Sequence, residues 1–181
     1  MNIFFLAACF REAARAQCNQ HVVKMLLEAV QLLYTAHHIG GTFDEPHDCP
    51  HTPYRKTHHN HPMSQWCRSC VQNYRWLHRH ALALAAEYTR RFGKVHGCEQ
   101  HLAWLATPPE TLSLNASHNP YDLELATVHA PVGCAGAPLC MGDAVDECRF
   151  ETPDGVDLTT SYEAYYIRKA EHIRMRWSPP L

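Results

Sequence analysis

The chain has 181 residues, of which 46% are hydrophobic, and a formal net charge of −2. This composition argues against an intrinsically disordered protein, and the length suits one domain, residues 1–181, with its own core. No apolar run reaches about 18 residues, which excludes a membrane-spanning helix from our expectations.

The first forty residues predict a buried entry segment followed by two helices. The opening stretch NIFFL is apolar and aromatic and lacks the basic start of a signal peptide, so we expect it buried as a strand or turn. A short helix is expected over residues 10–17 and a long one over residues 20–38. Gly40 and Gly41 then end the long helix, as glycine does at helix termini.

The long helix carries a narrow polar stripe on an otherwise apolar surface. At about 3.6 residues per turn, the stripe covers an arc of roughly 100°. It consists of His21, Lys24, Glu28, Gln31, Thr35 and His38. A surface helix has a wider and more charged polar face, so we expect this helix to be largely buried. The stripe then either satisfies a buried polar network or lines a site, and the residues alone support both interpretations.

The remaining elements alternate between helices and long irregular segments. Residues 40–61 contain three prolines and five histidines and predict a loop. We expect a second long helix over residues 62–92, opened by Pro62 and ended by Gly93. A shorter helix is expected over residues 99–107.

The last part of the chain completes a mainly α prediction. Residues 108–158 show little periodicity and are rich in Pro, Gly and Asn, which indicates a second irregular stretch. An aromatic and basic helix is expected from about residue 160 to residue 177. The sequence thus predicts a compact, mainly α single domain built on two long helices, with long irregular loops and a C-terminal aromatic and basic helix.

Charge is unevenly distributed along the chain. Residues 55–96 hold eight basic residues against one glutamate, whereas residues 97–161 hold ten acids and one arginine. A basic middle suits an anionic partner, and double-stranded DNA is the natural candidate, although a solvated helix face is the plainer explanation. The predicted DNA contacts are Arg68, Arg75, Arg79, Arg90, Arg91 and Lys94, together with Arg168 and Lys169.

Nine cysteines and fifteen histidines raise the question of a metal site. Cys67 and Cys70 form a CxxC pair, but no second CxxC follows at the spacing of a zinc ribbon, and no HExxH motif accompanies the histidines. A structural zinc site is the alternative to free thiols. We expect free thiols in a reducing compartment, the cytoplasm, or the host cytoplasm if a phage encodes the chain, with no metal and no cofactor.

Three helical segments resemble a widespread family of small phage proteins: NQHVVKMLLEAVQLL, NYRWLHRHALALAAEYTRRFGKVH and YEAYYIRKAEHIRMRW. That family is in turn distantly similar to the phage pyrimidine-dimer DNA glycosylases of the endonuclease V type. In those glycosylases a Gln-His pair precedes an essential glutamate, which follows the His by seven residues. Gln20, His21 and Glu28 stand at that spacing here.

The resemblance implies a compact α-fold that flips a base out of DNA and attacks the sugar C1′ with an N-terminal α-amine. Glu28 would stabilise the sugar intermediate, and His21 would orient it or the substrate. Residue 2 is Asn, behind which Met1 is expected to stay, and the aligned N-terminus is offset. Whether the terminal amine reaches Glu28 is therefore open, and Lys24, one turn from Glu28, is the alternative nucleophile.

The predicted function is a glycosylase and abasic-site lyase that acts on a flipped pyrimidine. One alternative is a transferase of phage DNA hypermodification, which attaches an amino acid or another small amine to a hydroxymethyl- or phosphomethyl-substituted uracil. Another is a DNA-binding protein without catalysis. The substrate-binding candidates are Gln31, His38, Asn73 and His80 on the helices, and Arg55, Lys56, His58, Asn60 and His61 before the second long helix.

Overall fold

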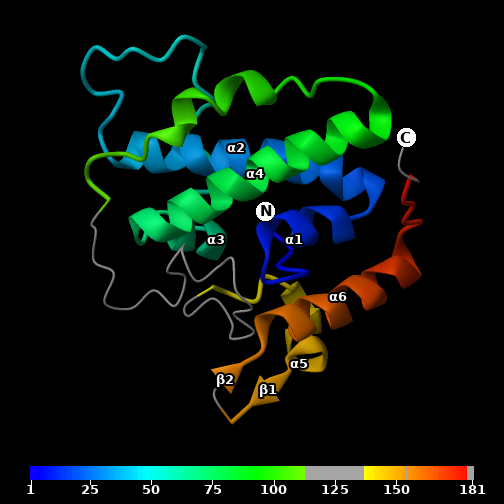
Figure 1. The fold of residues 1–181 in the computed structure, drawn as a ribbon. Helices are drawn as coiled ribbons and strands as arrows, with labels where there is room; N and C mark the ends of the chain where they lie inside the picture. Colours follow the sequence, from blue (N-terminus) through cyan, green and yellow to red (C-terminus); the bar gives the residue numbers. More distant parts are fainter. Residues whose placement is uncertain (113–136, 154, 179–181) are drawn as a thin grey trace.

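The computed structural model describes residues 1–112, 137–153 and 155–178 (Figure 1). Its helices are α1 (Phe10–Ala16), α2 (Asn19–Ile39), α3 (Pro62–Cys67), α4 (Val71–Phe92), α5 (Val145–Cys148) and α6 (Leu158–His172). A two-stranded antiparallel sheet pairs β1 (Glu151–Thr152) with β2 (Gly155–Val156). The prediction of a compact, mainly α fold is confirmed.

Helices α2 and α4 form the centre of the fold and run in opposite directions along each other (Figure 1). Leu26 and Leu33 of α2 and Leu77 and Leu84 of α4 are fully buried. Burying each such side chain stabilises the fold by about 1.5–3 kcal/mol relative to leaving it exposed. Helix α1 packs against α4. In the view of Figure 1, α6 lies on the other side of α1 from α4.

The prediction of one continuous helix over residues 62–92 is wrong. The helix stops after Cys67 and starts again at Val71. Ser69 Oγ and Asn73 Nδ2 donate hydrogen bonds of 2.8 and 2.9 Å to the carbonyl of Trp66. These side chains take the place of the backbone N–H that would bond this carbonyl in a continuous helix, which explains the break.

Two other helices are shorter than predicted. Residues 99–107 form two 3₁₀ turns, Glu99–His101 and Trp104–Ala106, instead of an α-helix. Helix α6 starts at Leu158, where Asp157 accepts a bond from the Thr160 N–H, and ends at His172.

The chain beyond α6 is extended because it binds another part of the fold. The Arg176 carbonyl accepts a hydrogen bond of 2.7 Å from the Asn19 N–H. Trp177 Nε1 donates to the Ala16 carbonyl at 3.0 Å. The Asn19 N–H and the Ala16 carbonyl both belong to the corner between α1 and α2. The tail therefore satisfies backbone groups that the ends of these helices leave free.

Arg91, which the sequence predicted as a DNA contact, lies inside the fold. Its guanidinium pairs with Glu87 and donates to the carbonyls of Gln17 at 2.7 Å and Arg15 at 2.8 Å. An arginine can satisfy the free carbonyls at the end of α1 while its charge is balanced by a carboxylate one turn away on its own helix. This Arg91 clamp therefore ties α1 to α4 and keeps the Arg91 side chain buried, away from a phosphate in solution.

No helix within the described ranges is long and apolar enough to cross a membrane. The eight cysteines that the structure describes are unpaired thiols, and Cys134 lies outside the described residues. Among the residues placed by the structure, no three His, Cys, Asp or Glu side chains gather as a metal site would require.

We expect the substitution Arg91→Met to destabilise the fold by about 3 kcal/mol, because it leaves a buried Glu87 carboxylate with only Arg90 as its partner. Urea unfolding followed by circular dichroism measures the difference. Arg79→Met, on the exposed side of α4, is the matched control and should stay within about 0.5 kcal/mol of wild type. Equal stability of the two variants would show that the clamp contributes nothing.

Candidate functional site

A pocket of about 490 Å³ opens beside the first half of α2. Segments from distant parts of the sequence meet there: the first residues of the chain, α2, the start of α3, the stretch before α5, and α6. Its polar and titratable lining includes His21, Lys24, Glu28, His61, Tyr165 and Lys169.

The polar stripe on α2 serves two purposes, one in each half of the helix. His21, Lys24 and Glu28 line the pocket. Further along, Thr35 Oγ1 donates to the Thr57 carbonyl at 3.1 Å and accepts from the Thr57 N–H at 3.2 Å. His38 Nε2 bonds the Tyr54 carbonyl at 2.8 Å. The first half of the stripe thus lines a pocket, and the second half forms a structural network.

Glu28 is the central carboxylate of the pocket and is only 9% exposed. Its Oε2 accepts a hydrogen bond of 2.8 Å from the backbone N–H of Asn2. Its Oε1 lies 3.6 Å from Nζ of the exposed Lys24. The carboxylate therefore has the start of the chain on one side and an ammonium group on the other.

The Asn2 side chain holds the start of the chain in place. Its Oδ1 accepts hydrogen bonds from the backbone N–H groups of Ile3 and Phe4, and its Nδ2 donates to the Cys140 carbonyl at 2.8 Å. Phe4 has a φ of 53°, a left-handed conformation that is costly for a large side chain. Its ring stacks on His21 with 4.5 Å between the ring centroids. This packing compensates for the strain and directs residues 1 and 2 toward Glu28.

His21 is buried and neutral at pH 7. Burial, followed by the charges of Lys169 and Lys24, lowers its pKa to about 4. Its Nδ1 lies 2.7 Å from the Tyr166 hydroxyl, which itself accepts a bond from the Cys18 N–H. The hydroxyl proton is then available to Nδ1, which favours the tautomer with the ring proton on Nε2.

His61 is the second histidine of the pocket and caps α3. Its Nδ1 accepts a hydrogen bond of 3.1 Å from the Met63 N–H, so a neutral ring carries its proton on Nε2. Burial is the main cause that lowers its pKa, and the charges of the chain's α-ammonium group and of His58 add to the effect, while Glu28 opposes it. These charges show that the α-amino group lies within electrostatic reach of His61.

The structure separates the other predicted substrate-binding residues from the pocket. Asn73 bridges α3 and α4, and His80 is buried against Trp76 with its Nδ1 bonded to the Phe10 carbonyl. Neither of these two side chains lines the pocket. The predictions for them are therefore not supported by this geometry, because both lie on α4 and face the core.

The segment before α3 flanks the pocket without lining it. Arg55, Lys56, His58 and Asn60 are exposed and precede His61, the residue of this segment that enters the pocket. Gln31 and His38 lie beyond Glu28 on α2 and are also outside the lining. Of the substrate-binding candidates in this segment, only His61 lines the pocket.

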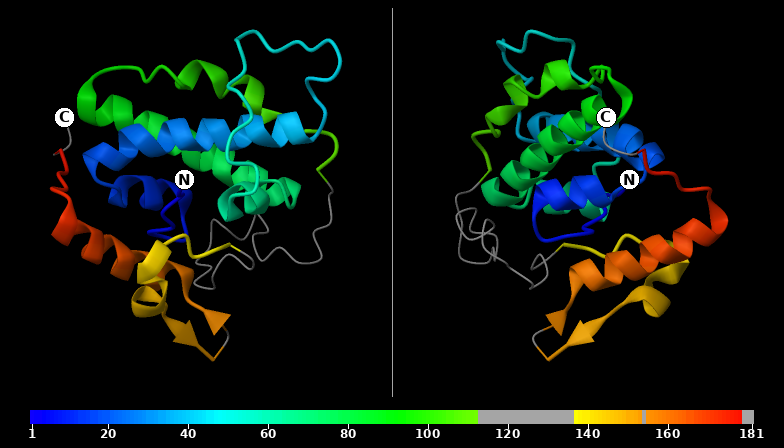
Figure 2. Two further views of the ribbon diagram at one scale, coloured as in Figure 1. Left: turned by 180° about the vertical axis from the view of Figure 1, so that it is seen from behind. Right: turned by 45° about the vertical axis from the view of Figure 1, so that its right-hand side comes forward.

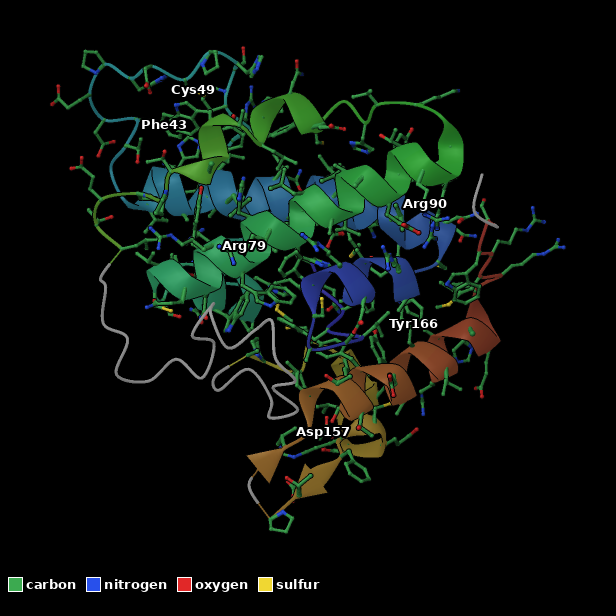
Figure 3. All side chains as sticks on the ribbon, viewed as in Figure 1. Phe43, Cys49, Arg79, Arg90, Asp157 and Tyr166 are labelled. Atoms are coloured by element: carbon green, nitrogen blue, oxygen red, sulfur yellow. The ribbon has the colours of Figure 1, made fainter. Side chains whose placement is uncertain are left out.

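The predicted DNA contacts divide between two sides of the molecule. Lys169 lines the pocket, with its ammonium group 5.5 Å from the centre of the Tyr165 ring. Arg79 and Arg90 project from α4 (Figure 3), where Arg75 is also exposed. Helix α4, which carries these arginines, lies in front of α2 in Figure 1 and behind it in the left view of Figure 2. The arginines of α4 and Lys169 are therefore carried by separate parts of the fold.

The other predicted contacts already have partners or lie at the surface. Arg68 donates to Ser64 Oγ at 3.0 Å, and Arg168 pairs with Glu147. Lys94 is exposed just after α4.

Several residues of the pocket had no signal in the sequence. Asn2, Phe4 and Tyr165 line it, and Tyr166 supports it through His21, but α6 is separated from α2 by more than a hundred residues. The polar stripe pointed to Glu28, and the resemblance to the glycosylases implied a terminal amine near it. No comparable signal pointed to Phe4, Tyr165 or Tyr166.

The chain matches no family model, no curated protein and no solved structure. A function is therefore inferred from the pocket itself. The pocket combines a buried carboxylate, the start of the chain, two lysines and two histidines with lowered pKa values.

We expect the protein to lose stability between about pH 6.5 and pH 5. Burial lowers the pKa of His21, His37 and His80 to about 4 in the folded state, so the unfolded chain, whose histidines titrate near 6.5, binds more protons in this window. Their contribution is fully present above pH 6.5 and decreases as the pH falls. Most exposed carboxylates stay ionised above pH 5.

Thermal unfolding at pH 7, 6 and 5 measures this effect. A melting temperature that stays constant over the range would contradict the assignment of these histidines as neutral in the folded protein.

Proposed function

We propose that this protein acts on a flipped pyrimidine nucleotide in DNA as a glycosylase and abasic-site lyase, with an amine beside Glu28 as the nucleophile. The observation that carries the proposal is the hydrogen bond of 2.8 Å between the Asn2 backbone nitrogen and Glu28. A carboxylate held against the start of a chain can accept a proton from an amine there and stabilise a cation that forms next to it.

Two forms of the terminal amine are compatible with this geometry. If Met1 is removed, the Asn2 nitrogen becomes an α-amine at the position that it already occupies beside Glu28. If Met1 stays, its own α-amino group lies in the same pocket, near enough to His61 to lower the pKa of that side chain. Lys24, whose Nζ is 3.6 Å from Glu28, is the competing amine.

The chemistry follows from a nucleophilic amine and a carboxylate. The unprotonated amine attacks C1′ as the glycosidic bond breaks, and the base leaves with the bonding electron pair and takes up a proton. Opening of the sugar ring gives an imine between C1′ and the amine. Loss of a proton from C2′ then breaks the C3′–O bond and releases the 3′ phosphate. Glu28 is placed to stabilise the cationic intermediates and to accept a proton.

The surrounding groups suit an anionic nucleotide. Lys24 and Lys169 bring two ammonium groups to the pocket, and phosphate oxygens are natural partners for them. The partly exposed Tyr165 ring provides aromatic surface at the same place, which favours stacking of an unpaired base. Neutral His21 and His61 can each donate a ring N–H to a carbonyl of the leaving base.

The retention of Met1 would favour the transferase as a second candidate. The Asn2 nitrogen would then remain an amide that donates to Glu28 Oε2, and Oε1 would be the oxygen that deprotonates an amine entering the pocket. Lys24 and Lys169 would hold a phosphoryl group on the 5-substituent of a uracil.

A borohydride trap tests the proposal on duplexes that carry a cyclobutane pyrimidine dimer, an abasic site, 5-hydroxymethyluracil or its phosphate ester. We expect a covalent protein–DNA adduct, detected by intact mass, that Glu28→Gln abolishes. Glu12→Gln, an exposed carboxylate on α1 outside this pocket, should form the adduct as wild type does. Absence of an adduct on all four duplexes would reject the lyase.

A mass gain on the modified uracil, when amino acids or small amines are supplied, would establish the transferase. The intact mass of the free protein also reports whether Met1 is present, which decides between the two forms of the terminal amine.

We expect the substitution Lys24→Met to leave adduct formation intact, because the α-amine and not the lysine is the proposed nucleophile. A Gly-Ser extension in front of Met1 should abolish the adduct, because it moves the α-amine out of the pocket. Peptide mapping of the trapped complex locates the modified nitrogen. An adduct that survives the extension but not Lys24→Met would assign the nucleophile to Lys24.

A further inference from the structure

A second and larger hollow, of about 920 Å³, lies between α1 and α4. Four arginines line it: Arg11 and Arg15 from α1, and Arg79 and Arg90 from α4, where Figure 3 shows the latter two. The hollow, called the arginine groove here, shares no lining residue with the Glu28 pocket.

Three of the four arginines in the arginine groove form no ion pair with a carboxylate of the described residues. Glu87 is already engaged by Arg90 and by the buried Arg91. Among the residues that the structure describes, no carboxylate forms an ion pair with Arg11, Arg15 or Arg79. Glu12 is the remaining acid in the lining. The groove therefore presents guanidinium groups that are free to bind an anion.

The spread of the arginines favours a chain of negative charges over a single anion. Arg11 and Arg15 are four residues apart on one face of α1, which separates them by roughly 6 Å along the helix. Arg79 and Arg90 are eleven residues apart, or roughly 16 Å along α4. Guanidinium groups distributed over this length do not converge on one phosphate, but they match a backbone with a phosphate at every step.

We propose that the arginine groove binds the phosphodiester backbone of a nucleic acid, separately from the Glu28 pocket. Guanidinium groups bind phosphate and carboxylate oxygens alike through paired N–H donors, and the regular phosphate spacing along a nucleic acid is what favours this partner over a carboxylate polymer. The apolar part of the lining consists mainly of Leu82 and small alanines, with no aromatic platform apart from Phe10, so the groove contacts backbone and not bases. The proposal does not depend on catalysis at Glu28.

The location of the groove has a consequence for the mode of binding. The arginine groove is built on α1 and α4, whereas the Glu28 pocket is built on α2, α6 and the segments beside them (Figures 1 and 2). Because the two sites share no lining residue, we expect a short duplex bound at one of them to leave the other free, provided that the Glu28 pocket also binds DNA as proposed above. We expect the protein to bind two short duplexes at saturation.

Fluorescence anisotropy with a fluorescein-labelled duplex of 12 base pairs, roughly one helical turn, tests the groove at several salt concentrations. The variant is Arg11→Glu/Arg15→Glu, and Arg174→Glu/Arg176→Glu is the control, because these two exposed residues line neither site. We expect the groove variant to lose one of the two bound duplexes and the control to keep both. For duplex that still binds the groove, the magnitude of the slope of log K against log salt falls by about 0.9 for each phosphate contact removed.

Further measurements separate this inference from the proposed catalysis. Glu28→Gln should bind duplex in the groove as wild type does, and the groove variant should still form the borohydride adduct. If the charge reversals lower the melting temperature, Arg11→Gln/Arg15→Gln removes the same contacts with a smaller perturbation. Wild-type stoichiometry and salt slope in a folded groove variant would overturn the proposal. So would competition by poly-glutamate as strong as that by a duplex of equal charge.

Discussion

The burial of α2 is the constraint on which the rest of the structure depends. This helix is covered on most of its circumference, yet it carries a stripe of polar side chains that cannot be left unsatisfied away from water. The segment at residues 54–57 satisfies the second half of the stripe through Thr35 and His38. The start of the chain satisfies the first half through Glu28. Two irregular segments are thus positioned by the polar groups of one buried helix.

The burial of two histidines shapes the chemistry of the Glu28 pocket. His21 and His61 have lowered pKa values, chiefly because burial disfavours their charged forms, and nearby positive groups add to this effect. The pocket therefore holds hydrogen-bond donors without adding further cations, and the positive charge comes from lysines and the α-amine. A similar balance appears in the Arg91 clamp, where a buried guanidinium is acceptable because Glu87 and two carbonyls complete its bonding.

The two concave regions suggest a division of labour. The Glu28 pocket, lined by five parts of the chain, collects the groups that the proposed chemistry on one nucleotide would use. The arginine groove collects charge on α1 and α4 without a buried carboxylate that is free to react. The sequence predicted a site on α2 and DNA contacts on α4 without placing the two relative to each other. Helix packing places them on different sides, because α4 buries its apolar face against α2 and turns its arginines away.

The sequence by itself determined the first two helices of this protein and pointed to the carboxylate of its pocket. Periodicity and glycine placed α1 and α2 within a residue or two of their observed ends, and the polar stripe drew attention to Glu28, because both signals are local. Only the tertiary structure decided what faces Glu28, where Arg91 is buried and where the helix over residues 62–92 breaks. These outcomes depend on contacts between segments far apart in the chain, such as Asn2 with Glu28 and Arg91 with Gln17. A local pattern carries no information about such a partner until packing brings the two together.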